Sequence, residues 1–149
     1  IKDGELFLTD RIKDLFKTSN GKYIAPQMIE SKILVDKYID QIAVIADQRK
    51  FVSALIIPVY GMLEEYARAH NIAFENREQL CANPQIYAMM KERIDTLQQQ
   101  LAHYEQVKRF TLLPHQFSME KGELTNTLKI RRRVLNENYK AEIDKMYED

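Results

Sequence analysis

The sequence predicts a mixed α+β domain in which a small central β-sheet is flanked by helices. Two nearly continuous apolar runs, residues 42–46 and 52–58, are separated by the polar turn 47–50. Runs without polar alternation are typical of strands buried on both faces, so we expect helices on both sides of this sheet. Predicted strands and helices alternate along the chain, with no internal repeat and no low-complexity linker. These observations favour a single domain over residues 1–149.

An N-terminal β-hairpin is also predicted. Short strand-like runs at 5–9 and 15–18 flank the charged segment 10–14, which is the pattern of two strands joined by a turn. Further along, Asn20-Gly21 supplies the positive φ of a tight turn. Pro26 then opens a helix that reaches about Lys37, because the fixed φ of proline suits the first helical position. The remaining expected elements are helices at 60–70, 77–80, from 84 onward and about 129–146, and a strand at 110–113.

From Pro84 onward, apolar residues recur at alternating steps of four and three, which is typical of one face of a helix. The stripe consists of Ile86, Met90, Ile94, Leu97, Leu101 and Tyr104. It has two interpretations: a coiled-coil seam for a partner, or a helix that packs on its own sheet. The stripe is shorter than three heptads, so we favour packing within the domain.

Composition excludes several classes of protein. The chain has 149 residues, enough to bury a core. Its 45% apolar and 30% charged content is that of a soluble globular protein. Lys plus Arg equals Asp plus Glu, at 22 each, so no overall field attracts nucleic acid or an acidic membrane surface.

Neither a disulfide framework nor a metal site is predicted. Cys81 is the single cysteine, which excludes an internal disulfide and fits a reducing compartment. The three histidines lie far apart, without Cys or carboxylate at metal-ligand spacing. No apolar run approaches the ~20 residues that span a bilayer. Residues 1–4 form neither a signal peptide nor an initiator methionine, so we expect the chain to begin within a longer sequence.

Two segments carry cations in loops. Residues 129–133 read Lys-Ile-Arg-Arg-Arg, which could form a phosphate- or nucleic-acid-binding patch or a solvated helix face. The arginines point in different directions on a helix, so we favour a solvated face for them. Lys129 differs, because it ends a polar loop and its ammonium is a point charge on a flexible stem, suited to a phosphate or carboxylate. Arg11 and Lys13 alternate within the other segment, where spacing alone favours ordinary turn chemistry.

Two motifs change that interpretation. Residues 10–27, followed by Ile29-Glu30, closely resemble the hinge motif of adenylate-forming enzymes. Within them, Thr-Ser-Asn-Gly-Lys-Tyr-Ile-Ala-Pro-Gln at 18–27 is similar to the form found in long-chain fatty acyl-CoA synthetases. Residues 122–132 resemble the final lysine motif of the same family, normally Gly-Glu-Leu-Thr-Pro-Thr-Leu-Lys, with Asn126 in place of the proline. The resemblance covers essentially the whole chain.

The resemblance implies that residues 1–149 are the C-terminal lid domain of such a ligase, with its hinge at 10–14 and its N-terminal AMP-binding domain absent. The family activates a fatty acid with ATP, with Mg²⁺ present, to acyl-AMP and pyrophosphate, and then forms acyl-CoA from CoA. The lid rotates between the two half-reactions. A cytoplasmic location is implied, and a peripheral contact with a membrane stays open. The domain alone should be inactive, because the phosphate loop, the magnesium-binding glutamate and the acyl pocket belong to the missing domain.

The same resemblance assigns roles to residues. Lys129 would bridge carboxylate and phosphate oxygens during adenylation, Arg11 would contact the ribose of ATP, and Lys13 would be the hinge. The loop that approaches the thioester-forming site and helps line the pantetheine path would be Ser19, Asn20, Gly21, Lys22 and Tyr23. Asn126 implies a looser approach to Lys129 than proline would give. Two alternatives stay open: an adenylating relative that loads a carrier protein, and a non-catalytic interaction domain that uses the stripe at 86–104.

Overall fold

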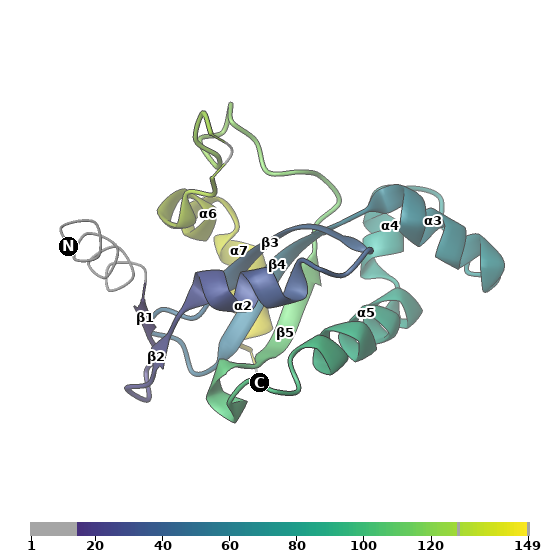
Figure 1. The fold of residues 1–149 in the computed structure, drawn as a ribbon. Coiled ribbons are helices and arrows are strands. Elements are labelled where there is room, and N and C mark those ends of the chain that lie inside the picture. The colour runs from purple at the N-terminus through teal and green to yellow at the C-terminus, as the bar shows by residue number, and fades with distance from the viewer. Residues whose placement is uncertain (1–14, 128, 149) are drawn as a thin grey trace.

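The computed structural model describes residues 15–127 and 129–148, and it contains a central three-stranded sheet in the order β3-β4-β5 (Figure 1). β3 (Ile39–Ile45) pairs antiparallel with β4 (Val52–Pro58), and β4 pairs in parallel with β5 (Val107–Leu112). The sheet is therefore mixed. The predicted strand at 52–58 matches β4, whereas β3 and β5 both begin three residues before the predicted runs at 42–46 and 110–113.

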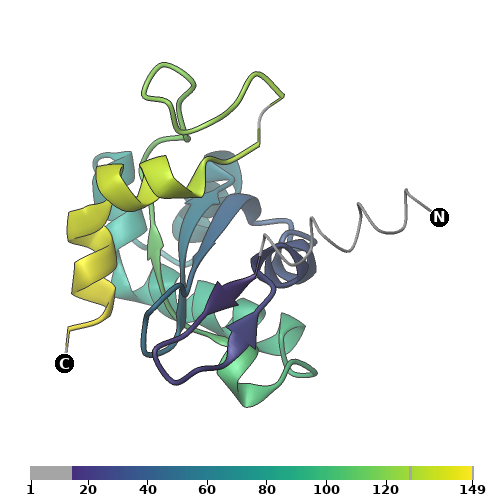
Figure 2. The same cartoon turned by 90° about the vertical axis from the view of Figure 1, so that its left-hand side faces the viewer.

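Helices cover both faces of this sheet, as the apolar runs predict. All seven residues of β4 are buried. α2 (Pro26–Ile33) and α5 (Pro84–Leu97) lie on one side, and α6 (Arg132–Asn138) and α7 (Lys140–Met146) lie on the other (Figure 2). α2 ends four residues before the predicted boundary at Lys37, because Asp36 accepts a hydrogen bond from the backbone N–H of Tyr38 and redirects the chain into β3.

The connection from β4 to β5 is long because parallel neighbours need a crossover. It contains α3 (Tyr60–Ala69), α4 (Arg77–Ala82) and α5, close to the predicted helices at 60–70 and 77–80. Asn76 and Asn83 cap α4 and α5 through their side-chain oxygens, which satisfies backbone N–H groups that a helix start leaves free.

The apolar stripe of α5 packs inside the domain. Ile86, Met90 and Ile94 have no exposed surface, so these side chains are not available to a coiled-coil partner, and the favoured interpretation is confirmed. The helix does not continue to residue 104. It ends at Leu97 because the buried side chain of Gln98 pairs with both backbone groups of Val107, donating to its carbonyl at 2.9 Å and accepting from its N–H at 2.8 Å. That pairing turns the chain through a 3₁₀ turn (His103–Glu105) into β5.

A hairpin precedes α2, but with a partner that the sequence did not indicate. β1 (Phe16–Lys17) pairs with β2 (Tyr23–Ile24), downstream of it. The predicted partner run at 5–9 lies outside the described residues. The turn closes locally: the Thr18 hydroxyl donates to the Lys22 carbonyl and accepts from the Lys22 N–H, and Gly21 has φ +83°.

The C-terminal helix predicted over 129–146 is wrong in two respects. Residues 129–130 belong to a loop, and α6 begins only at Arg132. The helix then bends at Tyr139, whose φ of −113° and ψ of 25° leave the helical range while its backbone still bonds to Leu135 and Ile143. The Tyr139 ring packs against His115 and Phe117, a tertiary contact that periodicity does not reveal.

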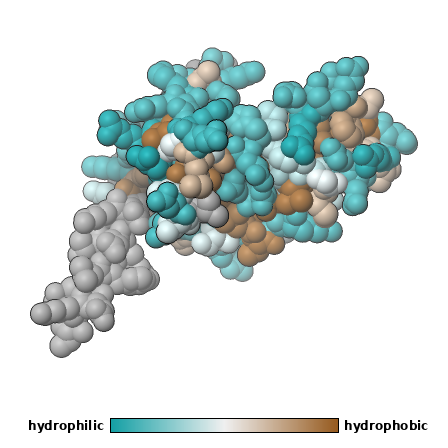
Figure 3. Space-filling model, turned by 90° about the horizontal axis from the view of Figure 1, so that it is seen from above, coloured by the Kyte–Doolittle hydropathy of each residue, from teal (hydrophilic) through white to brown (hydrophobic). Residues whose placement is uncertain are grey.

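One face of the domain is drawn in a space-filling view (Figure 3). Seen from above, it is mostly hydrophilic, with apolar side chains in small separate areas (Figure 3). Among the described residues, no helix combines the length and apolar character that crossing a membrane requires.

Candidate functional site

The segment before α6 forms a closed loop, which we call the lysine loop (residues 123–131). Leu124 and Ile130 form an antiparallel bridge at its base. The Thr125 N–H donates to the Lys129 carbonyl at 2.8 Å, and the Lys129 N–H donates to the Thr125 hydroxyl at 3.1 Å. The Arg131 N–H donates to the Glu123 carbonyl at 2.8 Å. The backbone of Lys129 is therefore held on both sides.

Glu123 fixes the base of the lysine loop from within. It is only 1% exposed. Its carboxylate accepts from the Ser118 N–H at 2.8 Å, the Asn138 amide at 3.0 Å and the Tyr139 hydroxyl at 3.3 Å. Burial, and then the neighbouring Glu123 charge, raise the pKa of Tyr139 well above its usual value, so this hydroxyl remains a donor.

The backbone of Lys129 is held, but its side chain is exposed. Within residues 15–127 and 129–148, no ion pair or side-chain hydrogen bond occupies its ammonium. Asn126 lies in the exposed turn of the same loop. A fixed backbone with a free ammonium can meet an anion that arrives from outside the domain.

A second loop, residues 18–22 with Tyr23, is the turn of the β1–β2 hairpin. It docks on the β3–β4 turn: the Ser19 N–H donates to the Arg49 carbonyl at 2.9 Å, and the Asn20 amide donates to the Lys50 carbonyl at 3.4 Å. The predicted pantetheine-path residues, Ser19, Asn20, Gly21, Lys22 and Tyr23, are all exposed. A Cβ added at Gly21 would meet no atom within 4 Å, so the surface of this loop is open.

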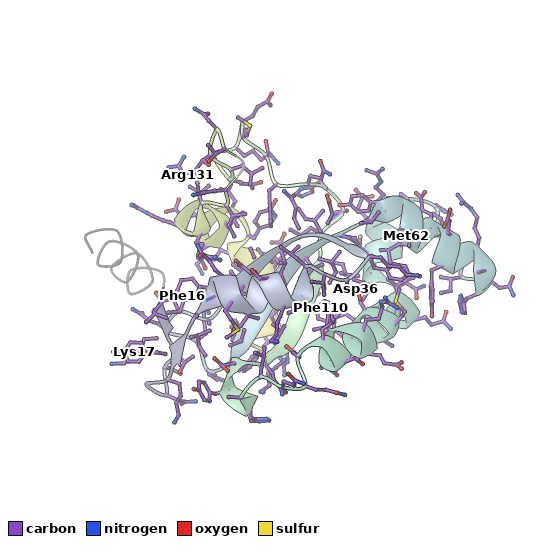
Figure 4. The ribbon with its side chains drawn as sticks, in the orientation of Figure 1. Phe16, Lys17, Asp36, Met62, Phe110 and Arg131 are labelled. Carbon is purple, nitrogen blue, oxygen red and sulfur yellow. The ribbon has the colours of Figure 1, made fainter. Side chains whose placement is uncertain are left out.

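The structure does not bring the two loops together. The lysine loop lies at one end of the domain and the β1–β2 turn at the other, as both ribbon views show (Figures 1 and 2). The labelled Arg131, at the base of the lysine loop, is likewise far from Lys17 of the hairpin (Figure 4). Arg11 and Lys13, the predicted ribose contact and hinge, lie outside the described residues.

One side chain nevertheless links the two motifs, and the sequence interpretation missed it. Arg132 donates to both carboxylate oxygens of Glu30, at 2.6 and 2.8 Å. Its side chain is 21% exposed, whereas that of Arg133 is 93% exposed. The expectation of a solvated face is thus right for Arg133 and wrong for Arg132. A signal was present: Glu30 follows the buried Ile29 on α2, and a carboxylate there needs a partner.

The described residues offer no cluster that would hold a metal. No group of three His, Cys, Asp or Glu side chains within them stands close enough to bind an ion.

Comparison with known proteins identifies the family. Residues 13–149 match the family model described as the AMP-binding enzyme C-terminal domain, and the chain belongs to this family. Its curated relatives include the long-chain-fatty-acid–CoA ligase FadD15 of Mycobacterium tuberculosis, which is 29% identical over 98% of this chain and 24% of its own length. The peroxisomal long-chain acyl-CoA synthetase 7 of Arabidopsis thaliana is 33% identical over 97% of this chain and 21% of its own length. The chain thus spans between a fifth and a quarter of these relatives.

Solved structures share the fold. The adenylation domain of a carboxylate reductase from Mycobacterium chelonae matches with a TM-score of 0.75 and 22% identity, over 93% of this chain and 20% of that protein. A Mycobacterium tuberculosis fatty acyl-CoA synthetase matches with a TM-score of 0.54 and 19% identity, over 89% of this chain and 21% of its own. The expected fold, the C-terminal domain of adenylate-forming enzymes, is confirmed.

Proposed function

We propose that this chain is the C-terminal domain of an ATP-dependent long-chain fatty acid–CoA ligase. In the first half-reaction, a carboxylate oxygen attacks the α-phosphorus of ATP and pyrophosphate leaves, giving acyl-AMP. In the second, the CoA sulfur attacks the acyl carbon and AMP leaves, giving acyl-CoA. The family match and the fatty acid–CoA ligases among the relatives support this assignment.

One observation supports the division of labour within the domain: the lysine loop and the β1–β2 turn lie at opposite ends (Figure 1). A rigid domain cannot bring both ends to one active site at once. It can bring them there in turn by rotating about a hinge, and such domain motions are a common way to gate successive steps.

Lys129 serves the adenylation step. The fatty-acid carboxylate and the ATP phosphates repel each other until a cation bridges them. An ammonium placed between the carboxylate and the phosphates stabilises the negative charge of the transition state. This stabilisation is strongest in a site that excludes water. The Lys129 ammonium is exposed on a fixed backbone and has no partner among the described residues, so it has the required freedom.

The β1–β2 turn serves the thioester step. Residues 19–22 are exposed and Gly21 carries no side chain, so a thin pantetheine arm can pass close to the backbone. Adenine, phosphate and acyl groups bind to the other domain, and this domain alone is expected to be inactive.

The assignment is tested with Lys129→Ala in the full-length ligase. Adenylation, measured by ATP–pyrophosphate exchange with a long-chain fatty acid, should fall by about 100-fold or more, the loss typical when a charge-stabilising group is removed. Thioester formation from supplied acyl-AMP and CoA should remain. Lys121→Ala, which removes another exposed lysine close to the lysine loop, is the matched control and should change neither rate. Equal loss of both half-reactions in Lys129→Ala would refute the proposed role.

The acceptor is tested separately. The unmodified ligase should transfer the acyl group to free CoA, and the product is measured as acyl-CoA by mass spectrometry. Transfer to a carrier-protein pantetheine, with none to CoA, would favour the adenylating relative that loads a carrier protein.

A further inference from the structure

The Glu30–Arg132 ion pair connects three elements, α2, α6 and β3. The guanidinium makes two parallel hydrogen bonds to the carboxylate, and Glu30 Oε2 also accepts from the backbone N–H of Val44 at 2.8 Å. The Glu30 side chain is 10% exposed. Three donors therefore hold one buried carboxylate, and they join the start of α6 to α2 and to β3.

The same guanidinium also contacts the hairpin. Its central carbon lies 5.5 Å from the centre of the Phe16 ring in β1, within the range of a cation–π interaction. Phe16 comes two residues after 10–14, the segment that the motif resemblance assigns to the hinge. Arg132 thus contacts the first strand after the hinge and is three residues from Lys129.

We propose that Arg132 is a positioning residue for adenylation, holding the lysine loop in a fixed orientation relative to the hinge-proximal hairpin, and this inference rests on the proposed role of Lys129. The Leu124–Ile130 bridge closes the lysine loop, and the bonds from Ser118 and Asn138 to Glu123 tie its base to the preceding segment and to α6. They do not connect it to β1 or α2. The guanidinium does, so rotation at the hinge carries the lysine with it.

Arginine suits this role better than lysine. Its planar fork matches both carboxylate oxygens at once, which fixes direction as well as distance, whereas an ammonium fixes only a distance. The β1–β2 turn does not depend on this pair, because it is held to the β3–β4 turn by bonds from Ser19 to Arg49 and from Gln48 to Lys17. Loss of Arg132 should therefore affect the end of the domain that carries Lys129.

The test uses Arg132→Gln in the full-length ligase, with both half-reactions measured at saturating substrates. The kcat of ATP–pyrophosphate exchange should fall about 10- to 100-fold, because small misplacements of a catalytic group have effects of this size. Thioester formation from supplied acyl-AMP should stay within about twofold. Arg132→Lys should recover only part of the exchange rate, since it restores charge but not the fork. Arg133→Gln, which removes the neighbouring exposed arginine, is the matched control and should leave both rates unchanged.

A second variant covers the risk that a carboxylate left unpaired prevents folding. Glu30→Gln with Arg132→Met removes both charges and keeps an acceptor for the Val44 N–H, and it should show the same selective loss of exchange. Equal loss of both half-reactions would mean a merely structural role and would overturn the inference, as would an unchanged exchange rate. If Lys129→Ala itself leaves exchange unchanged, the proposed function fails. If Lys129→Ala slows exchange and the Arg132 variants do not, only the positioning inference fails.

Discussion

Buried polar side chains determine the local geometry of this domain. Glu30 and Glu123 each gather three donors, and Gln98 pairs with both backbone groups of Val107. Because an unsatisfied buried polar group costs more than a satisfied one contributes, each of these side chains selects one arrangement of its neighbours. None of them belongs to the residues that touch substrate in the proposed mechanism, yet Glu123 holds the base of the loop that carries Lys129.

Sequence alone does not distinguish a buried, paired polar side chain from a solvated one of the same type. Arg132 and Arg133 are neighbours of the same type, yet one is held by Glu30 and the other is solvated. The difference depends on which of them faces α2, 102 residues away along the chain. The conformation of Gly21 was easier to predict, because the Asn-Gly pair by itself indicates a tight turn with positive φ.

A pH prediction follows from Tyr60 and Cys81, which both donate to the Leu113 carbonyl. Burial, and then the nearby Cys81, raise the pKa of Tyr60 to about 12. Burial, and then Glu78, raise the pKa of the Cys81 thiol to about 11. The unfolded chain releases these protons at lower pH than the folded one, so the free energy of unfolding should fall as pH rises from about 9 to 12.

Urea denaturation of the 149-residue chain between pH 8 and 11.5 measures this decline. Tyr60→Phe should lower stability at pH 8 by about 1 kcal/mol through the lost hydrogen bond, and it should make the decline above pH 10 shallower. Tyr104→Phe, at an exposed tyrosine, is the control and should keep the original slope. An unchanged slope in Tyr60→Phe would show that this hydroxyl does not contribute to the alkaline loss.

At the level of elements, patterns that depend on near neighbours were predictable and those that depend on distant partners were not. The strand at 52–58 and the start of α2 at Pro26 agree with the structure. The end of α5 and the bend at Tyr139 do not, because Gln98 pairs with Val107 and the Tyr139 ring packs on Phe117. The partner of β1 was also missed, since two-residue strands leave little periodic signal.

The packing of α5 gives a prediction with a control in the same helix. Met90 is fully buried, and its neighbour Met89 is only partly buried. Met90→Ala should lower the free energy of unfolding by about 2 to 5 kcal/mol, through lost apolar burial and the cavity left behind. Met89→Ala should cost about 1 kcal/mol or less. Urea denaturation of both variants decides this, and similar losses would contradict the assignment of α5 as a core helix of its own sheet.

For the whole molecule, the central feature is the placement of the two candidate loops at opposite ends of one sheet-and-helix body (Figure 2). Both motifs could be found in the sequence, and their family resemblance implied a domain that presents different faces. Their separation could not be read from the sequence, because it depends on how the sheet and α2 lie between them. In the proposed mechanism, this separation allows rotation about a single hinge to bring the two loops to one active site in turn.

The measurement that tests this account most directly compares Lys129→Ala with Gly21→Ala in the full-length ligase, each assayed in both half-reactions. Alanine at Gly21 meets no neighbouring atom but is strained at φ +83°, so it changes the β1–β2 turn while leaving the rest of the domain in place. We predict opposite patterns: Lys129→Ala slows acyl-AMP formation and spares thioester formation, and Gly21→Ala slows thioester formation and spares acyl-AMP formation. If both variants slow the same half-reaction, or each slows both equally, the two loops do not alternate and the account is wrong.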